Sequence, residues 1–85
     1  MASSLLGLRN LGPASVRMLA SAGIGTAAEL RRLGAVAAYR QVQRSGASPS
    51  LNLLWALEGA LADEPWQQVA RERRLALLLA LERMP

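Results

Sequence analysis

Apolar residues recur along the chain at intervals of three and four positions, the spacing that places them on one face of an α-helix. The pattern is densest from Leu51 to Ala62, where Asn52 and Glu58 are the strongly polar interruptions. A helix that is apolar on every side belongs at the centre of a folded domain. The pattern therefore predicts a helical protein built around the segment 51–62.

Capping and turn residues divide the rest of the chain into further short helices. Gly23 is expected to end one helix as a left-handed cap, with Ile24 folding back on its last turn. Thr26 and Glu29 are expected to form a capping box, in which each side chain satisfies one free N–H group at the next helix start. The expected elements are a short helix or turn over 5–11 and helices over about 13–22, 26–34, 35–45, 51–62 and 65–83.

The last of these helices carries more leucines than its main face can hold. Asp63 is expected to cap this helix and Pro65 to occupy its first position. Arg73 falls on the apolar face, so it is expected either to extend outward along its own stem or to pair with an acid such as Glu58. Three leucines point elsewhere and are expected to meet the N-terminal helices or a second subunit: Leu75, Leu78 and Leu79.

Composition agrees with a helical fold in a single small domain. Leucine occurs 17 times and alanine 16 times, against one isoleucine and no phenylalanine, and unbranched side chains lose little rotamer freedom on a helix. A chain of 85 residues is expected to form one domain over 1–85, because its apolar residues are enough for a single hydrophobic core. We therefore expect an all-α fold, a small compact bundle of five to six short helices with an N-terminal pair like a helix-hairpin-helix.

The missing residue types narrow the possible chemistry. The sequence contains no cysteine and no histidine, so thiolate metal sites, disulfides and the usual general base near neutral pH are absent. No convincing carboxylate pair replaces them, and we expect no enzymatic activity, no catalytic residue, no bound metal and no cofactor. The longest apolar run, 75–81, is too short to span a membrane, and residues 1–4 lack the basic segment of a secretion signal. A soluble cytoplasmic protein is expected.

Positive charge is concentrated in the first 46 residues. That part holds six arginines and one acid, Glu29, for a net charge of 6 − 1 = +5, whereas the remaining 39 residues hold four arginines and five acids, for −1. Exposed arginines near a helix start suit a phosphate backbone. The arginines in this basic part are Arg9, Arg17, Arg31, Arg32, Arg40 and Arg44.

The turn over residues 8–15 resembles the helix-hairpin-helix family, whose usual pattern places two glycines around an apolar residue before the second helix. Gly12 stands at the second glycine position and Asn10 at the first, and asparagine tolerates left-handed backbone angles better than most residues. The resemblance implies that free amides at the helix start bind a DNA phosphate. Because Pro13 has no N–H group, this contact would be made by the later amides, the Ser15 hydroxyl and the neighbouring arginines.

A longer resemblance covers almost the whole chain. Four stretches look like the C-terminal domain of the TfoX/Sxy regulators of DNA-uptake competence: 8–15 (LRNLGPAS), 22–24 (AGI), 33–39 (LGAVAAY) and 50–61 (SLNLLWALEGAL). The resemblance implies a helical bundle and a transcription-related role, as a co-regulator acting with the cyclic-AMP receptor protein. It implies no defined catalytic site, and family members commonly carry an N-terminal domain that this sequence lacks.

These observations leave two main hypotheses. In the first, the chain is a transcription-related accessory domain that contacts the DNA backbone without sequence specificity. Its DNA-binding residues would be Arg9, Asn10, Gly12, Ser15, Arg17, Arg40 and Arg44. Arg40 and Arg44 could instead belong to a solvated helix face with no binding role. The turn could instead be a plain connection between helices. Trp55 and Trp66 are interpreted as core residues and not as a stacking platform.

In the second hypothesis the chain is a protein-interaction adaptor or a homodimerising module that binds no nucleic acid. Its contact surface would consist of the surplus leucines of the last predicted helix, Leu75, Leu78 and Leu79. The partner would be a transcription factor, RNA polymerase or a second copy of the chain.

Overall fold

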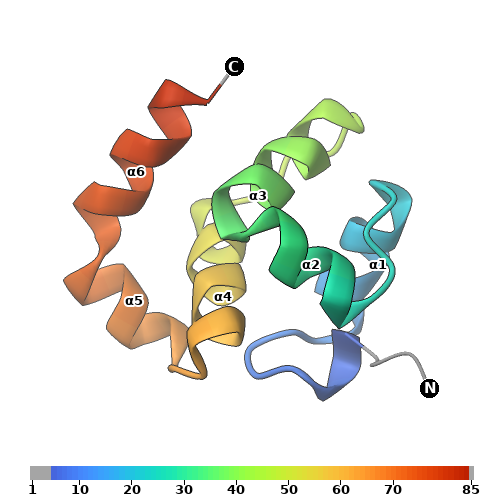
Figure 1. Cartoon of the computed structure of the whole chain (residues 1–85), viewed down its shortest axis with the longest axis horizontal. Helices are drawn as coiled ribbons and strands as arrows, with labels where there is room; N and C mark the ends of the chain where they lie inside the picture. Colours follow the sequence, from blue (N-terminus) through green and yellow to red (C-terminus); the bar gives the residue numbers. More distant parts are fainter. Residues whose placement is uncertain (1–4, 85) are drawn as a thin grey trace.

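The computed structural model describes residues 5–84, and within this range it contains helices and no strand. The all-α prediction is confirmed. The first member of the expected N-terminal pair is a three-residue 3-10 turn and not an α-helix, so the helix-hairpin-helix likeness remains a resemblance. The elements are η1 (Leu5–Gly7), α1 (Pro13–Ser21), α2 (Ala27–Leu33), α3 (Ala35–Arg44), α4 (Leu51–Ala62), α5 (Trp66–Glu72) and α6 (Arg74–Arg83) (Figure 1).

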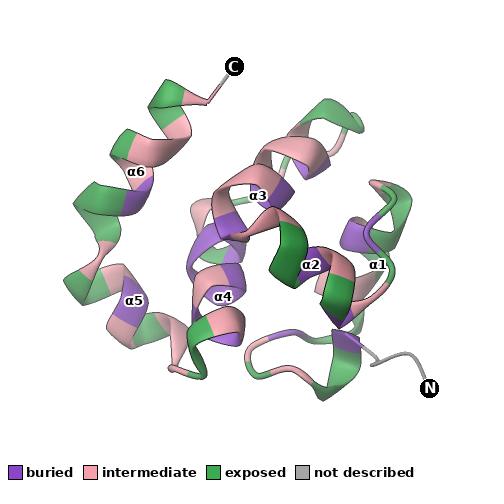
Figure 2. Ribbon diagram, in the orientation of Figure 1, coloured by how far each residue is buried: buried purple, intermediate pink, exposed green. Residues whose placement is uncertain are grey.

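Helix α4 lies at the centre of the molecule, as its apolar pattern predicts. Seven of its twelve residues are buried, including Leu54, Trp55 and Leu57, and it packs against α5 and α3. Figure 2 shows buried positions on nearly every turn of α4, whereas the outer helices alternate between buried and exposed positions. Trp55 is a core residue, as expected, and Trp66 packs at the edge of the core, partly exposed.

The two local caps form where the sequence predicts them. Gly23 has φ +86°, and the Ile24 N–H group donates to the Leu19 carbonyl at 2.9 Å, so Ile24 folds back onto the last turn of α1. Thr26 Oγ1 accepts from the Glu29 N–H group at 3.2 Å. The Glu29 carboxylate accepts a hydrogen bond from the Thr26 hydroxyl, where the full capping box would have it accept from the Thr26 N–H group.

The connection between α4 and α5 differs from the prediction. Asp63 was expected to cap α5, but it has left-handed angles (φ 56°, ψ 48°) and ends α4 instead. The Glu64 N–H group donates to the Gly59 carbonyl at 2.8 Å, which closes the last turn of α4. Helix α5 begins at Trp66, with Pro65 at its N-cap position and not at its first turn.

The predicted last helix is divided at Arg73 into α5 and α6, so the expectation of one continuous helix is wrong. Arg73 has φ −125° and ψ 13°, outside the helical range. A straight helix would place Arg73 on the same face as the buried residues Val69 and Leu77. The break lets its guanidinium group reach the carboxylates of Glu58 and Glu64 instead.

Helix α6 packs against α3 and α5, and its exposed positions include apolar as well as charged residues. Leu77 is buried, while Leu75 and Leu79 are 70% and 41% exposed. Leu78 packs partly against the core. Among the described residues, no helix has the length and hydrophobicity required to span a membrane.

Candidate functional site

The turn before α1 depends on a left-handed residue at its tip. Asn10 has φ 72°, which agrees with the expectation that asparagine replaces glycine at this position. The following Leu11 is buried, and Gly12 is the extended N-cap of α1, with φ −96° and ψ 180°. Pro13 occupies the first helical position, as predicted. The turn therefore places the start of α1 at the surface, while the neighbouring Leu11 is buried in the core.

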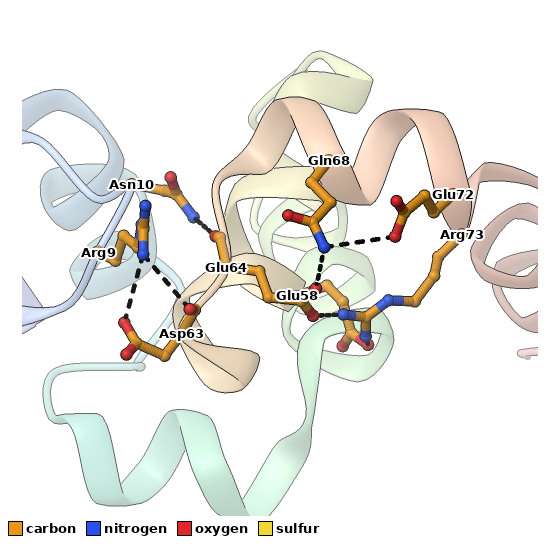
Figure 3. A network of polar contacts seen from close by, with 8 residues as sticks. All are labelled: Arg9, Asn10, Glu58, Asp63, Glu64, Gln68, Glu72 and Arg73. Carbon is orange, nitrogen blue, oxygen red and sulfur yellow. Dashed lines mark hydrogen bonds and ion pairs between the residues drawn. The ribbon is translucent and has the colours of Figure 1, made fainter.

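The side chain of Asn10 joins this turn to the start of α5. Its Nδ2 atom donates to the Glu64 carbonyl at 2.8 Å (Figure 3), and its Oδ1 atom accepts from the Trp66 N–H group at 3.2 Å. Asn10 thus acts as the N-terminal cap of a helix that begins 56 positions later. The sequence hypothesis assigned Asn10 to DNA contact, whereas the structure uses its side-chain amide inside the molecule.

Gly59 makes room for this contact. A Cβ atom built on Gly59 would collide with Asn10 Nδ2 and with the Glu64 carbonyl oxygen. The backbone of α4 must therefore approach the turn closely at this position. Sequence reasoning did not assign a role to Gly59, because its contact with Asn10 joins residues that are far apart in the chain.

Arg9 lies beside the same connection. Its Nη1 atom donates to the Asp63 carbonyl at 3.4 Å and lies 3.9 Å from Asp63 Oδ1 (Figure 3). The side chains are 49% and 89% exposed. Exposed ion pairs at such distances contribute roughly 0–1 kcal/mol, so Arg9 can exchange Asp63 for an external anion at little cost.

The start of α1 is open to solvent. Gly12, Pro13 and Ala14 are exposed, and no side chain caps the helix. A Cβ atom on Gly12 would meet no atom within 4 Å. Because the first amides of a helix have no partner within it, those of Ala14 and Ser15 are directed at this open surface. Arg17 is exposed on the next turn.

The structure does not bring Arg40 to this surface. Its Nη2 atom donates to the Leu81 carbonyl at 2.8 Å and its Nη1 atom to Gln43 Oε1 at 2.7 Å, so it joins α3 to the end of α6. Figure 1 shows that end of α6 at the top of the view and the turn before α1 at the bottom. Arg44 is exposed in the last turn of α3.

A shallow cavity of about 290 Å³ adjoins the start of α1. It lies between the turn before α1, the first two turns of α1 and α4, and the first residue of α5. Sequence reasoning missed it, because its walls come from three separate segments. Its lining combines apolar and hydrogen-bonding side chains: Asn10, Ala14, Ser15, Met18, Ser50, Asn52, Leu53, Ala56 and Trp66.

The acidic residues near α5 are engaged in a polar network. Arg73 Nη1 donates to Glu58 Oε2 at 2.7 Å, and Arg73 also pairs with Glu64. Gln68 Nε2 donates to Glu64 at 2.8 Å and to Glu72 at 3.3 Å (Figure 3). The predicted Arg73–Glu58 pair is therefore confirmed. In the part of the chain that the structure describes, no group of three or more metal-ligating side chains is placed to hold an ion.

The three leucines assigned to a protein interface do not share one environment. Leu75 and Leu79 are exposed on α6, but Leu78 packs against the hydrophobic core. Leu6, in η1, is also 56% exposed. The free apolar surface of α6 therefore consists of Leu75 and Leu79.

Comparison with known proteins gives one family and two solved structures. The model of the TfoX C-terminal domain family matches residues 1–81. An uncharacterised protein from Listeria monocytogenes, in a triclinic crystal form, is 29% identical with a TM-score of 0.80, over 89% of this chain and 86% of that one. A protein of unknown function from the same organism, in a tetragonal form, is 30% identical with a TM-score of 0.79, over 87% of this chain and 91% of that one. None of the curated proteins compared with the chain matches it.

Proposed function

The chain belongs to the TfoX C-terminal domain family, and from this premise we propose that it is a transcription-related accessory domain that contacts the nucleic-acid backbone at the start of α1. The observation that carries the proposal is the exposed, uncapped start of α1 between two arginines, Arg9 and Arg17. In this role the domain is a binding module of the cytoplasm and not an enzyme.

The chemistry of a helix start supports a phosphate contact. Free amides and the positive end of the helix dipole attract an anion, and the exposed Gly12 leaves space for a phosphate to approach the amides of Ala14 and Ser15. The Ser15 hydroxyl adds a further donor. Asn10 contributes by fixing the turn through Glu64 and Trp66, so its role is positioning.

The charge distribution along the chain also supports anion binding by its first part. The first 46 residues have a net charge of +5 and the rest −1, and localised positive charge raises the rate at which a polyanion is captured. Arg44 adds an exposed cation to this part of the chain. Arg40 adds charge at a distance, since its Nη atoms are bound within the molecule.

A salt series tests the proposal. Binding of a labelled duplex and a labelled single strand is measured by fluorescence anisotropy from 20 to 200 mM salt, where the logarithm of affinity is expected to fall linearly with the logarithm of salt concentration. The double variant Arg9→Ala, Arg17→Ala should lower the slope by about 2, because each of the two arginines is expected to neutralise one phosphate. The control is Arg71→Ala, Arg83→Ala, which removes two exposed arginines from the second part of the chain and should change the slope less. Absence of binding to either nucleic acid at 20 mM salt would refute the proposal.

The exposed leucines of α6 favour a second candidate function, contact with another protein or a second copy of the chain. Leu75 is 70% exposed and Leu79 41%, and the two lie four positions apart on one helix face, where they would form part of an apolar contact surface. The test is sedimentation velocity at rising concentration for the wild type and for Leu75→Gln, Leu79→Gln. Self-association that the double variant abolishes, and that the control Leu6→Gln retains, would support this candidate. A monomer at every concentration would exclude the homodimer.

A further inference from the structure

We propose that the cavity beside α1 takes one unstacked base of a nucleic-acid strand, so that the chain binds single strands in preference to duplexes. The inference rests on the proposed function and adds the kind of strand that the surface selects. Four properties of the cavity carry it: its size, its neutral lining, its hydrogen-bonding rim and its position next to the start of α1.

The size of the cavity limits its occupant to a small group. Sites for whole small molecules usually measure roughly 300–1,000 Å³, and this cavity, at about 290 Å³, lies just below that range. It is also open and not enclosed, so part of a bound group would remain outside. One planar ring system attached to a longer chain fits this description.

The lining indicates that the enclosed group is uncharged. None of the residues around the cavity is Asp, Glu or Arg, and a charged group loses hydration without compensation when it enters a neutral site. A metal ion is therefore not expected as the enclosed group, and a phosphate would stay at the edge of the cavity, on the free amides of Ala14 and Ser15. A nucleobase is neutral at physiological pH and leaves its phosphate at the rim.

The walls offer a base both a stacking surface and hydrogen bonds. Trp66 is partly exposed, and Met18, Leu53 and Ala56 give the cavity an apolar floor. Bases stack on aromatic side chains whatever their sequence. At the rim, the side chains of Ser15, Ser50 and Asn52 make no hydrogen bond to another of residues 5–84, so their donors and acceptors are available to the edge of a base.

The position of the cavity connects it with the backbone contact. Ala14 and Ser15 belong both to the open start of α1 and to the cavity wall. A strand whose phosphate lies on the amides of these residues would hold the attached base next to the cavity. In a duplex the bases are paired and stacked, so a base would enter only after leaving the double helix, which costs free energy.

Tryptophan fluorescence and strand competition test the inference together. Trp55 is 2% exposed and provides a constant background, so quenching on addition of a twelve-nucleotide thymidine strand would report contact with Trp66. At equal salt, the single strand is expected to bind about tenfold more tightly than a twelve-base-pair duplex, the effect of one stacked base. Trp66→Leu should remove this preference, so that the affinities for single strand and duplex become equal.

A second variant keeps the test valid if Trp66→Leu does not fold. Asn52 is exposed at the cavity rim, so Asn52→Ala should fold normally and lower single-strand affinity severalfold. The matched control is Gln67→Ala, an exposed amide next to Trp66 that does not line the cavity, and it should leave the affinity unchanged.

The possible outcomes separate this inference from the proposed function. Equal affinity for strand and duplex without quenching of Trp66 would overturn the inference while leaving the backbone contact intact, and a side chain of a protein partner would then be the remaining occupant. Absence of binding to any nucleic acid would overturn both. Thymidine monophosphate is not expected to saturate the site below millimolar concentration, and tight binding of it would overturn the assignment to a strand.

Discussion

Asn10 and Gly59 depend on each other at the residue scale. The Asn10 amide bridges the Glu64 carbonyl and the Trp66 N–H group, and it can do so only because Gly59 has no side chain at the point of contact. The surface start of α1 is thereby fixed to the centre of the fold. The Asn10 side-chain amide and the absence of a side chain at Gly59 therefore hold the candidate site in place.

Gly59→Ala is therefore expected to destabilise the protein, although alanine favours a helix by ~1 kcal/mol over glycine. The added methyl group would displace the Asn10 amide and press on the Glu64 carbonyl, which combines overpacking with the loss of hydrogen bonds. We expect the free energy of unfolding to fall by about 2 kcal/mol, as measured by urea denaturation. Gly25→Ala is the control, because a Cβ atom there would meet nothing within 4 Å. Equal or higher stability of Gly59→Ala would show that α4 does not approach the turn in this way.

Tyr39 gives a prediction for alkaline pH. Burial raises the pKa of its phenol, against a smaller lowering by the neighbouring Arg40 guanidinium, and its hydroxyl donates to the Pro49 carbonyl at 3.0 Å. Above the unfolded pKa of about 10, the folded state retains a proton that the unfolded state has lost. Stability is therefore complete below pH ~10 and falls as the pH rises through the folded pKa.

The sequence makes this effect measurable, since it holds one tyrosine, no cysteine and no lysine. The free energy of unfolding of the wild type should decrease between pH 9 and 11, whereas that of Tyr39→Phe should stay nearly constant. A parallel decrease in both proteins would assign the effect to groups other than Tyr39.

Residues whose partners lie nearby in the chain were predictable from sequence. The cap at Gly23 and the Thr26–Glu29 contact each involve residues within five positions, so their geometry follows from local rules. The cap that Asn10 supplies to α5 spans 56 positions, and no local rule selects its partner. The same limit applies to the cavity, which three distant segments form only after folding.

At the scale of elements, apolar periodicity located the helices but not the break between α5 and α6. A run of leucines at helical spacing continues through Arg73, and the sequence contains no glycine or proline there to mark an end. We attribute the break to tertiary electrostatics. In a continuous helix Arg73 would lie on the buried face, and the break lets its guanidinium group pair with Glu58 and Glu64. Burial of the Arg73 guanidinium group without a partner would cost more free energy than the break in the helix.

Arg73→Met tests this account. The variant removes the cation between two carboxylates whose side chains are 25% and 24% exposed. The loss should lie between the values for exposed and buried pairs, about 2 kcal/mol in the free energy of unfolding. Arg71→Met, at an exposed arginine of α5, should change stability by less than about 0.5 kcal/mol. A fully stable Arg73→Met variant would show that the break has another cause.

At the scale of the whole molecule, the basic and apolar surfaces occupy different places. The open start of α1 lies low in the view of Figure 1, and the exposed leucines belong to α6, whose last turn is at the top of that view. The molecule measures 35 × 26 × 21 Å, and each of these extents exceeds the Debye length of roughly 8 Å at physiological salt. Charges on one side of the molecule therefore act only weakly on a ligand at the opposite side.

This separation leads to a prediction about Asp63, the acidic partner of Arg9 at 3.9 Å. Asp63→Asn would keep the left-handed backbone that ends α4, since asparagine tolerates φ 56°. It would also free Arg9 for a phosphate and remove a negative charge from the binding surface. We expect the affinity for nucleic acid at 150 mM salt to rise about two- to fivefold, the equivalent of one exposed ion pair.

Glu82→Gln makes the same change in net charge at the exposed far end of α6, where screening should leave the affinity almost unchanged. Equal effects of the two variants in a salt-matched anisotropy titration would mean that net charge and not the start of α1 governs binding.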